Sequence, residues 1–235
     1  MAGRFESALT AIFTERPLPG RVKLHLHPVL GPWLATELAR ALQDDVVARC
    51  RAGSRKFDTA LCVDDAADVA WFEERYPGLA RYEAPPGAEL GERLASFFTL
   101  EWNERPRQST VALVADAPLL ATDTVIAAHR AMRRGAELVA VPDEHGGFAL
   151  LGLARDVPGL FEGVMPATEN LLARTLALAR EHGLECAELP SSFDIDTPDD
   201  LERLCVTLEH RLAQSEPVPL AVATLLDAWG LLPRA

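Results

Sequence analysis

The chain has 235 residues, of which 49% are hydrophobic and 25% are charged, and its formal net charge at pH 7 is −12. This length provides for an α/β domain with a substantial core. The acidic balance argues against general nucleic-acid binding, which requires a basic face. No apolar run approaches the roughly 18 residues of a membrane span, and the N-terminus lacks the layout of a signal peptide. We therefore expect a cytoplasmic protein without a nucleic-acid partner and without a membrane span.

The first predicted strand covers residues 9–13, a short apolar run with β-branched and aromatic members. The loop that follows it, at residues 16–23, contains Arg16, Gly20, Arg21 and Lys23, together with two prolines and a valine. Gly20 permits a close approach or a positive φ, and the cations offer charge to an anion such as a phosphate. Lys23 is one of only two lysines in the chain, which favours a chemical requirement for an ammonium over a solvated lysine.

Helical and strand patterns alternate along the rest of the chain. Helices are predicted at residues 32–50, 66–75, 88–102, 122–134, 169–181, 198–213 and 220–229, and strands at residues 58–63, 79–84, 110–115, 137–141, 148–153 and 184–189. Thr122 or Asp123 is expected to cap the fourth helix, and Thr197 or Asp196 the sixth, with Pro198 at its first position.

The spacing of two strands identifies the kind of sheet. Only six residues separate the strands at 137–141 and 148–153. Because a parallel crossover needs a dozen or more residues, this pair is predicted to be antiparallel. The whole pattern predicts a three-layer α/β/α domain over residues 1–235, with a mostly parallel mixed sheet and a C-terminal helical extension from about residue 214.

Several polar segments follow predicted strands, where ligands of such sheets bind. They are the loop at 16–23, the turn at 85–89, Asp116, and residues 194–196. Asp116 is suited to hold Mg²⁺ or Mn²⁺ against a diphosphate, or to cap backbone amides of its own turn. Asp194 and Asp196 lie on one side of an extended segment and could complete a cation site, although Asp196 is also a natural helix cap.

For Glu144 and Arg93, the sequence is consistent with either a functional or a purely structural role. Glu144 lies in a turn with two glycines, where it could act as a base or contact a substrate hydroxyl, or be a solvated turn residue. Arg93 could reach a ligand or pair with Glu89, four residues earlier on one helix face.

Six short motifs occur along the chain in a fixed order. They are Pro17-Leu-Pro-Gly-Arg-Val-Lys23, Glu89-Leu-Gly-Glu-Arg-Leu94, Asp116-Ala-Pro118, Glu144-His-Gly-Gly-Phe148, Phe161-Glu-Gly163 and Asp194-Ile-Asp-Thr-Pro-Asp-Asp-Leu201. In this order they resemble the motifs of small bacterial nucleotide-diphospho-sugar transferases of the GT-A fold, also called radical-SAM/selenodomain-associated transferases. The resemblance covers roughly residues 9–207 and extends to 2-phospho-lactate and molybdenum-cofactor guanylyltransferases.

The resemblance implies a GT-A fold and a set of site residues. It implies that the loop at 16–23 binds nucleotide phosphates and that a divalent cation, Mg²⁺ or Mn²⁺, is bound by Asp116 with the help of Asp194 or Asp196. It further implies that the turn at 85–89 lies near the base or sugar. The predicted catalytic residues are Asp116, Asp194 and Glu144, and the predicted nucleotide-binding residues are Arg16, Gly20, Arg21, Lys23, Gly87, Glu89 and Arg93.

Three functions remain open from the sequence. The first is metal-assisted glycosyl transfer from a nucleotide-diphospho-sugar to an acceptor that the sequence does not identify. The second is nucleotidyl transfer of the guanylyl type to a phosphorylated acceptor, with the same residues. The third is a catalytically degenerate binding protein, because Leu24 and His25 stand where the family carries threonine and arginine.

Overall fold

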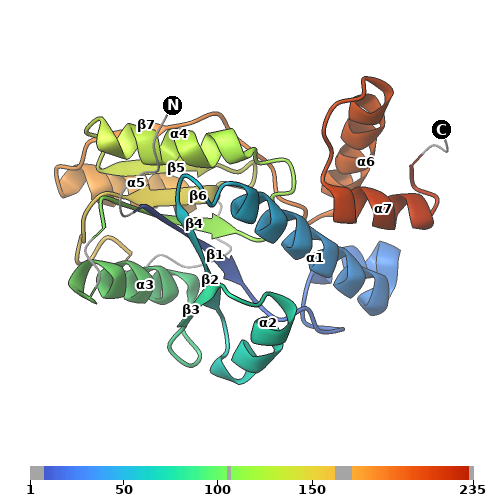
Figure 1. The fold of residues 1–235 in the computed structure, drawn as a ribbon, viewed down its shortest axis with the longest axis horizontal. Coiled ribbons are helices and arrows are strands. Elements are labelled where there is room, and N and C mark those ends of the chain that lie inside the picture. Colours follow the sequence, from blue (N-terminus) through green and yellow to red (C-terminus); the bar gives the residue numbers. More distant parts are fainter. Residues whose placement is uncertain (1–7, 105–106, 162–170, 233–235) are drawn as a thin grey trace. The chain divides into compact units, whose positions relative to one another are not determined.

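The computed structural model describes residues 8–104, 107–161 and 171–232 (Figure 1). It divides into two compact units. The first, here called the sheet unit, comprises residues 1–16, 49–114 and 121–192. The second, here called the helical unit, comprises residues 17–48, 115–120 and 193–235. The expectation of a single domain with a C-terminal extension stays a prediction.

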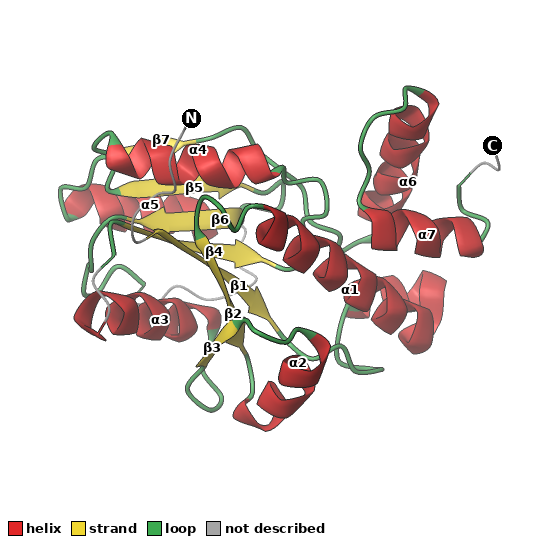
Figure 2. Cartoon of the chain, in the orientation of Figure 1, coloured by secondary structure: helices red, strands yellow, loops and turns green. Residues whose placement is uncertain are grey.

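The sheet unit is built on seven strands in the order β3-β2-β1-β4-β6-β5-β7 (Figure 2). The strands are β1 Ala8–Thr14, β2 Asp58–Val63, β3 Ala80–Glu83, β4 Ser109–Val114, β5 Leu138–Pro142, β6 Phe148–Leu153 and β7 Cys186–Glu188. β6 runs antiparallel to both of its neighbours, whereas the other pairs are parallel. The predicted mostly parallel, mixed sheet is thus confirmed, including the antiparallel pair.

Helices cover both faces of this sheet. On one face, α3 (Leu90–Glu104) and α5 (Leu171–Glu181) pack onto strand residues in one apolar cluster that includes Leu9, Phe97 and Leu176. On the other face lies α4 (Thr122–Arg133), whose Met132 approaches Gly152 so closely that an added Cβ would lie 2.9 Å from its Cε. The three-layer α/β/α architecture is therefore confirmed. The unit also contains the 3₁₀ helix η2 (Ala66–Asp68) and α2 (Val69–Arg75).

The helical unit contains most of α1 (His27–Ala52), together with the 3₁₀ helix η1 (Leu24–Leu26), α6 (Pro198–Ala213) and α7 (Leu220–Ala228). Gly31 interrupts α1 with φ 69° and ψ 169°, so the regular helix resumes at Pro32, where the sequence predicted its start. The core of the unit joins the three long helices through buried residues that include Leu38, Leu42, Leu204, Leu208, Val222 and Leu226.

A buried carboxylate also ties α7 to α1. Asp45 of α1 is 8% exposed, and its two carboxylate oxygens accept hydrogen bonds from the backbone N–H groups of Ala221 and Val222, each at 2.9 Å. These two N–H groups belong to the first turn of α7, where no partner within the helix is available to them. Asp45 therefore caps a helix far along the chain.

The predicted helix caps have different outcomes. Thr197 caps α6, with Pro198 next to it as predicted, and Asp200 completes a capping box. The prediction for α4 was wrong, because the capping position is Ala121, which has an extended backbone and no side-chain cap. Thr122 and Asp123 thus lie inside the first turn of α4.

Among the described helices, none combines the length and the apolar composition that a membrane span requires.

His129 forms a polar bridge in the interior of the sheet unit. It is fully buried, with Nε2 3.0 Å from Thr10 Oγ1 and Nδ1 2.8 Å from Ser109 Oγ. The bridge joins α4 to the neighbouring strands β1 and β4. Burial lowers the pKa of His129 from its ordinary value of 6.5 to about 3. The imidazole is therefore neutral at pH 7, and protonating it in the folded protein is unfavourable.

This pKa makes part of the stability depend on pH. Because the folded pKa lies below the unfolded one, the unfolded chain takes up the proton first, and stability falls as pH falls from about 6.5 towards 3. Between about pH 7.5 and about pH 5 we expect His129 to account for a loss of about 2 kcal/mol. Urea unfolding of His129→Asn should lack this part of the loss, whereas exposed His182→Asn should keep it. Equal pH dependence in the two variants would contradict the assignment.

Candidate functional site

Two neighbouring strands deliver the chain to the candidate site. β1 and β4 pair in parallel, so the loops that follow them start at the same edge of the sheet. The chain passes from the sheet unit into the helical unit after Arg16 and again after Val114. The segments that follow carry Lys23 and Asp116, and a third segment brings Asp194 and Asp196 into the same unit.

A tight turn sets the course of the first segment. The Arg21 N–H donates a hydrogen bond of 3.0 Å to the Leu18 carbonyl, and Gly20 has φ 82°. Pro19 followed by a glycine with positive φ is the pattern of a type II turn. An added Cβ at Gly20 would meet nothing within 4 Å, so the positive φ, and not a close approach, requires the glycine. The side chain of Arg21 points from this turn as an exposed cation.

Lys23 bridges two of the predicted metal ligands. Its Nζ lies 2.7 Å from Asp116 Oδ2 and 2.7 Å from Asp196 Oδ1, and only 8% of its side chain is exposed. Burial alone lowers the pKa of Lys23, but the Asp116 and Asp196 carboxylates outweigh that effect and hold the pKa above its ordinary value. The ammonium is therefore charged at every pH at which the protein is expected to work.

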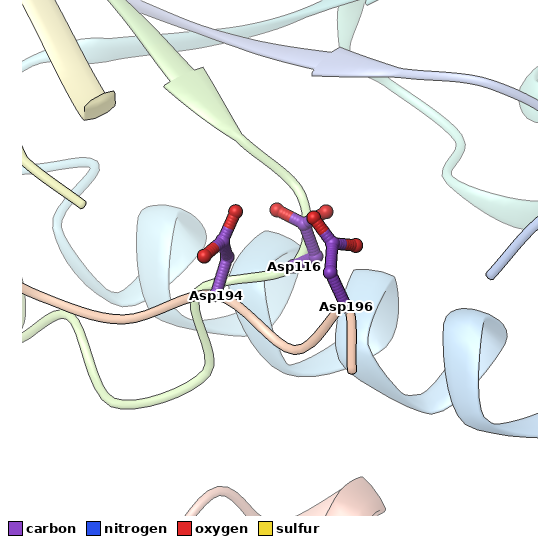
Figure 3. Close-up of side chains that lie close together, drawn as sticks. All are labelled: Asp116, Asp194 and Asp196. Carbon is purple, nitrogen blue, oxygen red and sulfur yellow. The ribbon is translucent and has the colours of Figure 1, made fainter. Parts of the chain in front are cut away.

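The two carboxylates that Lys23 contacts belong to a cluster of three. Carboxylate oxygens of Asp116, Asp194 and Asp196 all lie within 4.8 Å of one another, and the three side chains project to the same side (Figure 3). Ile195 fixes this arrangement, because its N–H donates a 3.2 Å hydrogen bond to the Asp116 carbonyl and its side chain is buried in the core of the helical unit. Alternation along the extended segment then places Asp194 and Asp196 on the opposite side.

The alternative role of Asp196 as a helix cap is excluded by the geometry. Thr197 is the capping residue of α6, and Asp200 Oδ2 accepts hydrogen bonds from the Thr197 N–H at 2.7 Å and the Asp196 N–H at 3.2 Å. The backbone of Asp196 is thereby held by Asp200, and its side chain is directed to Lys23. The three-residue spacing of Asp200 from Thr197 was the sequence signal of this capping box.

The donor set suits a hard divalent cation. Mg²⁺ and Mn²⁺ are bound by carboxylate oxygens, and the cluster offers such oxygens from three residues. Asp116 Oδ1 is buried and accepts no hydrogen bond from the described part of the chain. A buried acceptor without a donor is unfavourable unless a ligand completes it. The residues thus fit the cation that the sequence predicted, while its presence stays a prediction.

Arg16 and Arg93 were predicted to bind phosphate or nucleotide. Both lie in the sheet unit, and each pairs with an acidic residue of that unit. Arg16 Nη1 lies 3.1 Å from Asp68 Oδ1, and its guanidinium lies 5.6 Å from the centre of the Trp71 ring. Arg93 pairs with Asp64, which follows β2, and lies 5.6 Å from the centre of the Phe13 ring. The sequence did not single out Asp64 for this role, although its place after a predicted strand was a usable signal.

The remaining predicted residues also belong to the sheet unit. Gly87 has φ 71° in an exposed turn before α3, and the Glu89 N–H donates to Glu92 Oε2 at 3.1 Å. Glu144 is exposed in the turn between β5 and β6, whose shape is set by Asp143. Oδ1 of that residue accepts hydrogen bonds from the N–H groups of His145 and Gly147 at 2.8 and 2.7 Å. The motif at 161–163 lies largely outside the described residues.

Comparison with known proteins identifies the family. The model of a family described as "Uncharacterized protein conserved in bacteria (DUF2064)" matches residues 46–168. A phosphoenolpyruvate guanylyltransferase of Sphaerobacter thermophilus is 30% identical over 186 residues, which cover 77% of this chain and 86% of the relative. The chain belongs to the DUF2064 family. Its curated relative is thus a nucleotidyltransferase.

Solved structures confirm the fold. A protein of Desulfovibrio desulfuricans G20 assigned as a nucleotide-diphospho-sugar transferase superposes with a TM-score of 0.85 at 23% identity, covering 97% of both chains. A CMP:2-keto-3-deoxy-manno-octonic acid synthetase, solved with CTP, superposes with a TM-score of 0.55 at 14% identity over 87% of this chain and 99% of its own. This chain thus has the nucleotide-diphospho-sugar transferase fold that the six motifs predicted, and the fold is shared with nucleotidyltransferases.

The capping box that holds Asp196 is testable through stability. Asp200→Ala removes the acceptor of the Thr197 and Asp196 N–H groups, and we expect a loss of about 1–2 kcal/mol in the free energy of unfolding. Asp199→Ala is the matched control, because Asp199 is exposed in the same helical turn, and its effect should stay within about 0.5 kcal/mol. Urea denaturation measures both, and equal losses would show that the capping box has no special role.

Proposed function

We propose that this protein is a metal-assisted nucleotidyltransferase that transfers a guanylyl group from GTP to a small phosphorylated acid. The observation that carries the proposal is the cluster of Asp116, Asp194 and Asp196, two of which contact the Lys23 ammonium. Such a cluster suits a substrate whose reacting part is a metal-bound polyphosphate. The relative of 30% identity, a phosphoenolpyruvate guanylyltransferase, supports the choice of reaction and makes phosphoenolpyruvate the first acceptor to test.

The reaction requires charge neutralisation more than covalent chemistry by the protein. A phosphate oxygen of the acceptor attacks the α-phosphorus of GTP, a new phosphorus–oxygen bond forms, and the bond to the β-phosphate breaks to release pyrophosphate. Both substrates are anions, and the protein itself carries a net charge of −12. Local positive charge is therefore needed where the phosphates bind.

The residues of the cluster divide this task. Asp116, with Asp194 and Asp196, would hold Mg²⁺ or Mn²⁺, and the bound cation would neutralise charge on the triphosphate and on the leaving pyrophosphate. Lys23 and Arg21 would contact phosphate oxygens, since an ammonium and a guanidinium both donate to phosphate. We retain Arg16, Gly20, Gly87, Glu89 and Arg93 as proposed nucleotide-binding residues and Glu144 as a proposed catalytic residue. For Arg16 and Arg93, this role requires that a phosphate or a base compete with Asp68 and Asp64.

Glycosyl transfer from a nucleotide-diphospho-sugar is the second candidate. It is supported by the assigned function of the Desulfovibrio protein, and it would use the same cation site to stabilise a departing nucleoside diphosphate. The sequence alone favoured glycosyl transfer. We now place guanylyl transfer first because of the guanylyltransferase relative. A binding protein without catalysis is the third candidate.

Product analysis separates the three candidates. Incubation with GTP, Mg²⁺ or Mn²⁺ and phosphoenolpyruvate should release pyrophosphate and form a guanosine diphosphate ester, as followed by a coupled pyrophosphate assay and mass spectrometry. Release of GDP or UDP from nucleotide sugars, without pyrophosphate release from any triphosphate, would select glycosyl transfer. Nucleotide binding without turnover would select the third candidate, and the absence of any nucleotide binding would contradict both enzymatic candidates.

The proposed metal ligand can be tested in the same assay. Asp116→Asn replaces one charged ligand with a neutral one at the half-buried position, and we expect the rate of pyrophosphate release to fall by about 100-fold or more. Asp123→Asn makes the same chemical change on an exposed residue of α4 and should retain the rate. An Asp116→Asn variant that keeps the activity and its dependence on the cation would remove Asp116 from the site.

A further inference from the structure

We propose that the Lys23 ammonium is a built-in substitute for the divalent cation, so that the metal enters the carboxylate cluster only together with a phosphate group that draws Lys23 away. This inference rests on the proposed function, because it describes how the same site is loaded. The Lys23 side chain would then determine that the metal binds together with the phosphate and not before it.

The ammonium and the metal compete for the same oxygens. Lys23 Nζ lies 2.7 Å from one oxygen of Asp116 and 2.7 Å from one oxygen of Asp196. Carboxylate oxygens are also the ligands of Mg²⁺ and Mn²⁺, so a divalent cation held by Asp116 and Asp196 would compete with the ammonium for these oxygens. A cation bound to other oxygens of the cluster would face the positive charge of Lys23 at close range, where repulsion between like charges is strong.

Lys23 is held in this position by its backbone and by burial. Its φ of 51° and ψ of 46° are left-handed, a conformation that is uncommon for residues other than glycine. Its carbonyl accepts the 2.9 Å hydrogen bond from the Leu26 N–H that begins η1. The side chain is 8% exposed, so most of its charge is shielded from water and depends on Asp116 and Asp196 for compensation.

The entry of a metal therefore needs a second partner. A cation that displaces Lys23 leaves a largely buried ammonium without its two carboxylates, which is unfavourable unless another anion receives it. A nucleotide phosphate supplies that anion. The metal and the nucleotide then favour each other's binding, and the coupling is reciprocal. In the absence of nucleotide, the Lys23 ammonium offsets part of the negative charge of the cluster, and we expect the cluster to bind Mn²⁺ weakly.

Removing the ammonium should open the cation site. In Lys23→Met, without nucleotide, we expect Mn²⁺ to bind about tenfold or more tightly than in the unaltered protein, because a neighbouring positive charge is lost. Lys56→Met makes the same change at the only other lysine and should bind Mn²⁺ like the unaltered protein. Electron paramagnetic resonance of free Mn²⁺, with calorimetry, measures these affinities. Lys23→Gln, whose amide can donate hydrogen bonds to the carboxylates, is the second variant if Lys23→Met does not fold, and it should also bind Mn²⁺ more tightly.

The outcomes distinguish this inference from the proposed function. Mn²⁺ affinity in the folded Lys23 variants that is equal to or weaker than that of the unaltered protein, or no Mn²⁺ binding at all, overturns the inference. Pyrophosphate release by the unaltered protein in the presence of Mn²⁺ would still support the transferase in that case. Tighter Mn²⁺ binding by the variants would uphold the competition between Lys23 and the cation even if the unaltered protein bound no GTP, a result that would instead contradict the proposed function.

Discussion

The site depends on one interaction, the ammonium of Lys23 held between the carboxylates of Asp116 and Asp196. Three acidic side chains within 4.8 Å of one another repel each other, and the Lys23 ammonium offsets part of that repulsion. The lysine makes the cluster stable without a ligand, and it does so at the place where a polyphosphate and its cation are proposed to bind. Stability of the empty site and function of the loaded site thus require the same residues in two arrangements.

The sheet explains why residues so far apart in sequence meet. β1 and β4 are parallel neighbours, so the chain leaves both strands at one edge and delivers Lys23 and Asp116 to the helical unit. The third segment arrives after β7 and is fixed by the Ile195 side chain in the core and by the capping box of Thr197 and Asp200. Rigid elements on either side thereby position an extended segment whose alternation presents Asp194 and Asp196 together.

Much of this was predictable from the sequence, because strand and helix periodicity is local information. The antiparallel β5–β6 pair followed from the length of one connection, and the three aspartates followed from their places after strands and before a helix. The partners of Arg16 and Arg93 were not predicted. The place of Asp64 after a strand marked it as a polar residue at the sheet edge, but ion pairs such as Arg93–Asp64 join segments whose separation only the folded sheet determines. Likewise, no local pattern indicated that Lys23 would turn to Asp116 and Asp196, since its left-handed backbone departs from residue preference.

Asp45 ties the C-terminal helix α7 to the rest of the helical unit. Because its carboxylate receives the first N–H groups of α7, the last described helix completes a polar contact inside the unit that carries Lys23 and Asp116. A shortened chain that ended before Leu220 would lose both donors and the apolar contribution of Val222 and Leu226. The helix α7 is therefore part of the scaffold of the unit that carries the candidate site, and Asp45 joins it to α1 across 176 residues of sequence.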